Sequence, residues 1–346
     1  MQDTAHIGGT DTAPSHAPDQ HFRGGLGLGE VSARFFNAMT LITSVFLVVS
    51  AVYLLVTYPY VIKNLYYHTS YLFIIVPMVV PVFSMRGGGL CVYYTFITAF
   101  VVFSVLWSVR PLLKHSVAGE ERKHWSTGTN GVHGLLVWSF FHDTDATRSV
   151  LRAVSVSIFV PVAWYFSLRA VGIEPLVPDF SEYPLWKQIY GFANAGFWEE
   201  FLTRFVYLLL PLLPAWYVSA DSPSLKRYFQ HILNGFEEPP PFFLPMLFFS
   251  ALMFGLAHAL GGWDLYKVLP SFVSGLVFGY IAVKAGFPSA VAAHFAVDFL
   301  SLTGSGNPAL VFFGLVPVLL FFLSGGLVSL ATLFDLARSL RSEKGY

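Results

Sequence analysis

Six ionisable side chains lie within or beside strongly apolar stretches of the C-terminal half of this chain. They are Glu199, Glu200, Arg204, His258, His294 and Asp298. A charged group near the centre of a lipid bilayer costs several kcal/mol, so charged groups that persist there are usually functional and have a partner. Carboxylates and imidazoles in a partly desolvated site can take a proton from water and stabilise developing negative charge. The residue types therefore predict acid–base chemistry.

The spacing of these residues supports that prediction. Glu200 and Arg204 are four positions apart, so on a helix they share one face and can form an ion pair. Glu199 is rotated from Glu200 by about 100° on a helix and can point elsewhere. One acid and one base would suffice for a structural ion pair, and the second carboxylate is therefore free to act as a base.

Each group also has a structural interpretation. Glu200 with Arg204 is compatible with an intramembrane ion pair that only stabilises the fold. His294 and Asp298 are again four apart, and a hydrogen bond across one helical turn would explain them. His258 alone could be a core histidine bonded to a carbonyl. Three separate structural explanations are less economical than one site at which the helices carrying these residues converge.

The elements that must position the residues are membrane helices. The chain is 55% hydrophobic and only 12% charged, whereas a soluble domain has about 25% charged residues. A helix needs about 20 apolar residues to cross the hydrocarbon layer. The predicted fold is all-α, a polytopic transmembrane bundle of eight or nine spans with the active site between helices of its C-terminal half. The candidate spans are Phe36–Ile62, Ser70–Met85, Leu90–Val109, Val150–Leu168, Ile189–Tyr217, Phe242–Leu260, Val268–Val283, Pro288–Leu302 and Ala309–Phe334.

The second candidate span is short and contains Pro77 and Pro81, which predicts a kinked or re-entrant segment. The span containing Gly275 and Gly279 has the small-residue spacing typical of close helix packing.

The predicted organisation has four parts. Residues 1–33 form a disordered tail, and residues 34–171 form N-terminal spans interrupted by a polar loop at 110–148. Residues 172–305 form the catalytic core, and residues 306–346 form the last helix and a basic C-terminal tail. The net charge of zero gives no indication of a nucleic-acid partner, and the single cysteine, Cys91, is interpreted as a packed residue.

Lysine and arginine residues concentrate in the loops on one side of the predicted membrane. The positive-inside rule then places the C-terminus in the cytoplasm and predicts a site near the cytoplasmic face. The N-terminus lies outside if the Ser70–Met85 span crosses the membrane and inside if it does not.

Three motifs in order resemble those of one known family. Glu-Glu-x-x-x-Arg at 199–204, Phe-x-x-x-His at 254–258 and His-x-x-x-Asp at 294–298 are similar to the motifs of the CPBP superfamily. That superfamily comprises the type II CAAX prenyl endopeptidases and their bacterial and archaeal relatives, often called CAAX amino-terminal proteases. The resemblance covers about residues 189–302 and implies an intramembrane endopeptidase.

The resemblance also implies a role for each residue. Glu199 and His258 would hold and deprotonate the attacking water, while Glu200 and Arg204 would position that pair and could also position the carboxy end of the substrate. His294, with residue 298, would stabilise the oxyanion. The prenyl endopeptidases have Asn at the position of Asp298, and an ionised aspartate cannot donate a hydrogen bond to an oxyanion. Asp298 would then be protonated, orient His294 or bind a metal.

A zinc site is an alternative to the glutamate mechanism. Glu199, His258, His294 and Asp298 form an acceptable nitrogen and oxygen ligand set for zinc. The chain lacks a His-Glu-x-x-His helix, and the resemblance favours a mechanism without a cofactor.

The resulting prediction is hydrolysis of a membrane-associated peptide, lipidated or membrane-embedded, with a prenylated CAAX-type peptide as one candidate. A proton- or cation-coupled transporter would use the same residue types. A non-catalytic membrane scaffold or immunity protein of the same superfamily is a third interpretation. The membrane would be the plasma membrane in a prokaryote or the endoplasmic reticulum in a eukaryote.

Overall fold

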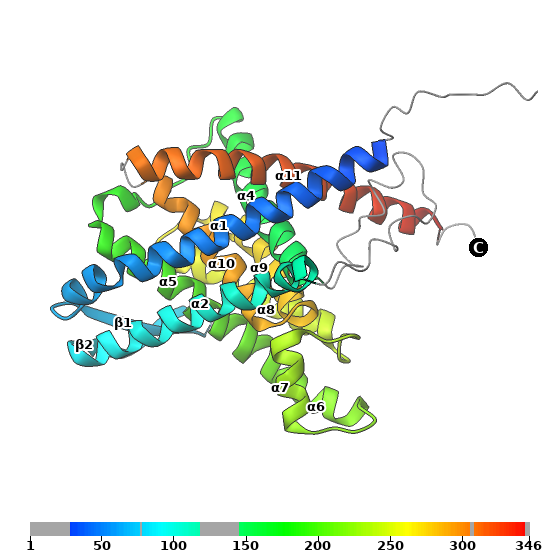
Figure 1. Ribbon diagram of the computed structural model, residues 1–346, viewed down its shortest axis with the longest axis horizontal. Coiled ribbons are helices and arrows are strands. Elements are labelled where there is room, and N and C mark those ends of the chain that lie inside the picture. Colours follow the sequence, from blue (N-terminus) through cyan, green and yellow to red (C-terminus); the bar gives the residue numbers. More distant parts are fainter. Residues whose placement is uncertain (1–27, 77, 118–144, 305–307, 343–346) are drawn as a thin grey trace, which may run out of the picture.

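Long helices dominate the protein because a chain in lipid must satisfy its backbone hydrogen bonds internally. The computed structural model describes residues 28–76, 78–117, 145–304 and 308–342 (Figure 1). Its longer helices are α1 (Leu28–Leu65), α2 (Gly88–Val117), α4 (Ala146–Ala170), α5 (Leu185–Glu200), α6 (Leu210–Ser219), α7 (Leu225–Asn234), α8 (Phe243–Leu260), α9 (Val268–Lys284), α10 (Phe287–Leu300) and α11 (Pro308–Ser342). Short helices are η1 (Phe180–Glu182), η2 (Phe201–Leu209), η3 (Leu265–Lys267) and η4 (Ser301–Gly304).

Seven helices of the described part of the chain are long and apolar enough to cross a membrane. One of them is the continuous run of α5, η2 and α6 over Leu185–Ser219. Together with the shorter apolar helix at Phe287–Thr303, they correspond to the predicted spans other than Ser70–Met85. The prediction of an all-α polytopic bundle is confirmed.

The predicted second span is not a helix. The structure has an antiparallel hairpin there, with β1 (Thr69–Val76) paired to β2 (Met78–Arg86) from Thr69↔Arg86 to Val76↔Met78. A register shift follows Leu72. A run rich in β-branched residues that contains Pro81 is poorly suited to a helix, because proline removes a backbone donor and clashes with the preceding turn. Pro77 lies outside the described residues.

Helix α10 is central to the bundle and contacts α2, α4, α5 and α9 (Figure 1). Nearly all of its side chains are buried, and many are alanines, which let neighbouring helices approach. It begins after Gly286, whose φ of 92° a larger residue would rarely adopt. Close packing also occurs where Gly275 of α9 meets the backbone of Ala251 on α8.

Hydrogen bonds between connecting segments and helix ends identify the two ends of the bundle. At one end, which we call the connector end, the α4–α5 connector meets the α8–α9 loop, since Leu176 N donates to Asp264 Oδ2 at 2.6 Å. At the other end, Phe236 N donates to Val283 O at 2.7 Å and Trp107 Nε1 to Leu233 O at 2.7 Å. Helix α11 contacts η4 near its start, where Gly314 meets Thr303, and passes Ser155 in the middle of α4 at Gly325, so the C-terminal end of α11 lies at the end opposite the connector.

Several predicted segments fall partly outside the described residues. Helix α1 begins at Leu28, inside the predicted tail, and residues 1–27 are outside. Helices α2 and α4 extend into the predicted polar loop, of which 118–144 are outside. Helix α11 runs through most of the predicted basic tail, of which 343–346 are outside.

Candidate active site

A change of helix type occurs within the first motif. Helix α5 ends at Glu200, and η2 is a π-helix from Phe201 to Leu209 that continues the same rod. π-Helical segments are rare and frequently occur at functional sites. Glu199 and Glu200 therefore lie at the junction, and Arg204 lies within the π-helical turn.

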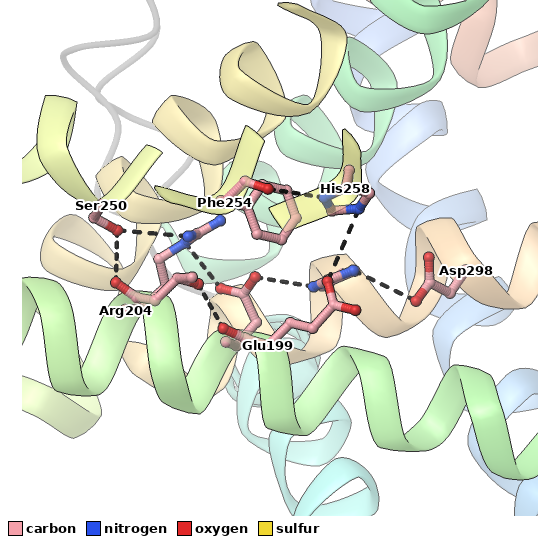
Figure 2. Close-up of polar contacts among 9 residues, drawn as sticks. Glu199, Arg204, Ser250, Phe254, His258 and Asp298 are labelled. Atoms are coloured by element: carbon pink, nitrogen blue, oxygen red, sulfur yellow. Dashed lines mark hydrogen bonds and ion pairs between the residues drawn. The ribbon is translucent and has the colours of Figure 1, made fainter. Parts of the chain in front are cut away.

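A buried ion pair forms one half of the site (Figure 2). Arg204 Nε lies 3.1 Å from Glu200 Oε2, and both side chains are fully inaccessible to solvent. His294 Nδ1 lies 2.9 Å from Glu200 Oε1, and this side chain is 5% exposed. Glu200 thus links Arg204, which lies on the same continuous helix, to His294 of α10. A carboxylate so deep in the bundle is compatible with folding because both of its oxygens face a donor.

Aromatic rings and one hydroxyl complete the surroundings of Arg204. Its guanidinium carbon lies 4.6 Å from the centroid of the Phe254 ring and 5.9 Å from that of Phe278. Arg204 Nη1 makes a long 3.5 Å contact with Ser250 Oγ, which itself donates to Thr203 O at 2.5 Å. These contacts hold Arg204 in one orientation and away from solvent.

A second group of side chains reaches accessible space. Glu199 is 22% exposed and His258 is 18% exposed, with Glu199 Oε2 3.9 Å from His258 Nε2. Asp298 is 23% exposed, and its Oδ2 lies 3.4 Å from His294 Nε2. The six predicted residues are therefore brought together, with Glu200, Arg204 and His294 buried behind Glu199, His258 and Asp298.

The tautomer of His258 follows from its hydrogen bond. Nδ1 of His258 lies 2.8 Å from Phe254 O, and because a carbonyl can only accept, Nδ1 carries the hydrogen. In the neutral ring, Nε2 is then an acceptor that faces Glu199. The 3.9 Å gap is too long for a direct hydrogen bond. A water molecule to one side of the pair, with its oxygen about 2.8 Å from each atom, could donate one hydrogen bond to Glu199 Oε2 and one to His258 Nε2.

The predicted zinc ligands do not fit a metal in this arrangement. Within the part of the chain that the structure describes, no group of three or more His, Cys, Asp or Glu side chains is arranged to hold a metal ion. Both ring nitrogens of His294 face carboxylates, at 2.9 Å and 3.4 Å. His258 offers one free nitrogen, because the other is bonded to Phe254 O.

A glycine sets the distance between the two helices that carry Glu200 and His294. A Cβ built at Gly196 would lie 3.0 Å from the Phe295 Cα on α10. Gly196 is one turn before Glu200, and Phe295 follows His294. The close approach of α5 and α10 therefore brings the imidazole within bonding distance of the carboxylate.

The site lies towards the connector end of the bundle. His258 is in the last turn of α8, and Asp298 is in the last turn of α10. Both helix ends adjoin the α8–α9 loop or η4, opposite the C-terminal end of α11. The two expectations of a cytoplasmic C-terminus and a site near the cytoplasmic face are thus incompatible, because charge counting orients the helices without locating a site along them.

Sequence reasoning missed some of the residues around the site. Ser250 lies one helical turn before Phe254, and its hydroxyl is one of many in the apolar helices of the chain. Phe278 stacks on His294 with ring centroids 5.1 Å apart. No pattern in the sequence distinguishes Phe278 from the many other phenylalanines of the chain.

Comparison with known proteins gives one family. Residues 181–300 match the profile of the family described as "Type II CAAX prenyl endopeptidase Rce1-like". The matched segment runs from η1 to the end of α10 and contains all three motifs. Searches of curated proteins and of solved structures gave no significant match.

Proposed function

We propose that the chain hydrolyses a peptide bond of a membrane-associated substrate with water activated by Glu199 and His258. The premise is the match of residues 181–300 to the type II CAAX prenyl endopeptidase Rce1-like family. At the family level this is an intramembrane CAAX-type protease. A peptide with a lipidated or membrane-embedded segment is the natural substrate for a site inside a helix bundle.

The exposure of the two carboxylates of the first motif carries the proposal. Glu199 is partly exposed and lies 3.9 Å from Nε2 of His258, whereas the neighbouring Glu200 is fully buried in ion pairs. An accessible carboxylate beside an imidazole acceptor is the arrangement that general-base catalysis requires. A purely structural ion pair would not need Glu199.

The proposed reaction starts with a water molecule bonded to Glu199 and to Nε2 of His258. As the water oxygen bonds to the scissile carbonyl carbon, Glu199 takes the proton. The carbonyl oxygen becomes an oxyanion in a tetrahedral intermediate. When the intermediate collapses, the carbon–nitrogen bond breaks, and Glu199 returns the proton to the leaving amine nitrogen.

His294 is the proposed donor to the oxyanion. Its Nδ1–H is directed to Glu200, and its Nε2 points to Asp298 at 3.4 Å, longer than a normal N–H···O bond of about 2.7–3.2 Å. An N–H with so long a contact is available, without rotation of the ring, to a stronger acceptor as charge develops on the substrate. Asp298 then orients the imidazole and does not itself donate, which explains how an aspartate serves at this position.

Glu200 and Arg204 are positioning residues in this scheme. Arg204 holds Glu200, and Glu200 holds the His294 ring, so the oxyanion donor is fixed before substrate arrives. Such preorganisation lowers the barrier because no reorientation is needed in the transition state.

A comparison of C-terminal peptides in cells tests the proposal. Cells with the wild-type protein are compared with cells carrying Glu199→Gln, and Glu174→Gln is the matched control, since Glu174 lies on the connector with its side chain 76% exposed. The account predicts that longer C-terminal peptides of membrane-associated proteins accumulate only with Glu199→Gln. Identical C-terminal peptides in all three strains would contradict it.

A further inference from the structure

A partly exposed cation lies beside the site on the loop that follows His258. Lys267 ends η3, between α8 and α9. Its Nζ lies 4.0 Å from the centroid of the Trp263 ring. Trp263 in turn is attached to the last turn of α8, because its backbone N donates to His258 O at 3.2 Å. Lys267 is therefore placed next to the end of the helix that presents His258.

The loop that carries Lys267 is held from two directions. Asp264 caps η3 through Tyr266 N at 2.9 Å and also accepts from Leu176 N of the connector. On the other side, Trp164 Nε1 of α4 donates to Tyr266 O at 2.8 Å. Because these hydrogen bonds hold the loop backbone in place, the side chain of Lys267 can bring its ammonium group only to a limited region beside the site.

The charges around Lys267 leave its ammonium group available to an incoming anion. It interacts electrostatically with Asp298 and Glu199, and also with His258. Yet no carboxylate in the described part of the chain forms an ion pair with it within 4.0 Å. Arg204, in contrast, is fully buried and paired to Glu200. Lys267 is thus a cation near the exposed carboxylates whose charge no direct partner neutralises.

On the basis of the proposed function, we infer that Lys267 binds the C-terminal carboxylate of the peptide that is cleaved beside Glu199 and His258. A peptide that ends in a carboxylate must bring a negative charge close to Glu199 and Asp298. A fixed ammonium group offsets that repulsion and supplies a charge-assisted hydrogen bond. A peptide segment that continues past the site would bring no such charge, so Lys267 would favour bonds close to a free C-terminus.

The test compares three peptides that differ only at their last residue. The first ends in a free carboxylate, and the second ends in a carboxamide. The third ends in a carboxamide but has an aspartate as its last residue, so its carboxylate belongs to a side chain. The enzymes are the wild type, Lys267→Gln and Lys267→Arg in nanodiscs. Lys187→Gln is the matched control, since Lys187 also lies 4.0 Å from an aromatic ring, that of Tyr183.

We expect the wild type and Lys187→Gln to prefer the free carboxylate over the carboxamide by about tenfold or more in kcat/KM, mainly through KM. Lys267→Gln loses most of this preference by raising KM for the free carboxylate, and Lys267→Arg keeps it. The aspartate peptide should behave as the carboxamide.

Other results would distinguish a failure of the role of Lys267 from a failure of the proposed function. A wild type without preference, or a Lys267→Gln variant with an undiminished preference, would overturn the role of Lys267. Equal cleavage of the aspartate peptide and the free carboxylate would overturn recognition of the C-terminus. A wild type that cleaves none of the peptides would instead overturn the proposed function on which the inference rests.

Discussion

Glu199 and Glu200 are neighbours in the chain but occupy opposite environments. The rotation of about 100° between successive helical residues turns Glu200 into the ion pairs with Arg204 and His294, while Glu199 faces His258 and accessible space. In the proposed mechanism, the same residue type therefore serves stability at one position and chemistry at the next. The two roles can be separated experimentally.

Substituting glutamine for either glutamate should separate stability from activity. Glu200→Gln leaves Arg204 as a buried cation without its carboxylate, which should cost about 3–5 kcal/mol of unfolding free energy. Glu199→Gln should leave stability nearly unchanged and abolish cleavage. Thermal unfolding of both variants in nanodiscs measures the difference. Equal destabilisation by the two substitutions would contradict the division of roles.

Asp298 should act through its acceptor oxygen. Asp298→Asn keeps an oxygen that can accept from His294 Nε2, so cleavage should stay within about tenfold of the wild type. Asp298→Ala removes the acceptor and should reduce kcat further, by about 100-fold, because the imidazole loses its orientation. Steady-state kinetics of the two variants checks the order. A more active alanine variant would show that the aspartate charge hinders the oxyanion.

The six ionisable residues could be found from the sequence because they are rare in apolar spans and recur at helical spacing. Ser250 could not. Hydroxyl groups of many membrane helices bond to the carbonyl one turn earlier in their own helix, as Thr40, Thr43 and Ser50 do here. Nothing in the sequence indicates that Ser250 instead donates to Thr203 O on another helix.

At the scale of elements, the packing of α5 on α10 depends on Gly196. Gly196→Ala adds a methyl group at 3.0 Å from the Phe295 Cα, and overpacking of this kind costs about 1–3 kcal/mol. We expect lower thermal stability and weaker cleavage, because α10 carries His294 away from Glu200. Gly191→Ala in the same helix is the control, since nothing lies within 4 Å of its added methyl group. Similar losses in both variants would contradict a specific role of this contact.

The hairpin β1–β2 is the element whose secondary structure could not be predicted from the sequence. The periodicity of a short apolar run between polar segments does not by itself distinguish a helix from a strand. The structure resolves the ambiguity through contacts that are distant in sequence. Trp198 Nε1 donates to Phe73 O at 2.9 Å, and Tyr207 OH donates to Ile75 O at 2.7 Å. The rod of α5 and η2 thus satisfies backbone carbonyls along the outer edge of β1, which a local pattern cannot foresee.

At the scale of the whole molecule, most of the lysine and arginine residues of the loops lie at the end opposite the site, although Lys267 lies beside it. We propose that the C-terminus is cytoplasmic, which puts Lys226 of α7 in the cytoplasm and the connector on the other side. Cysteines placed by Lys226→Cys and Glu174→Cys in a Cys91→Ala background should react with a membrane-impermeant reagent from opposite sides. Lys226→Cys should need permeabilised membranes. Labelling of both from one side would contradict the two-ended arrangement.

The order of helices and the membrane class could be predicted because they follow from long apolar runs. The position of the site along the membrane normal could not, since it depends on how deep in its helix each residue sits once α8 and α10 are packed. The number of lysine and arginine residues in each loop indicates the orientation of the helices, but it gives no information on the depth of a residue within a helix. The family match covers residues 181–300.

The central claim is that Glu199 activates water for peptide hydrolysis. The most direct test uses purified wild type and Glu199→Gln in nanodiscs, with a prenylated CAAX-type peptide in ¹⁸O-labelled water, and mass spectrometry of the products. The wild type should give a shortened peptide with one ¹⁸O in its new C-terminal carboxylate, and Glu199→Gln should be slower by about 100-fold or more. Labelled product from a folded Glu199→Gln variant at the wild-type rate would contradict the account.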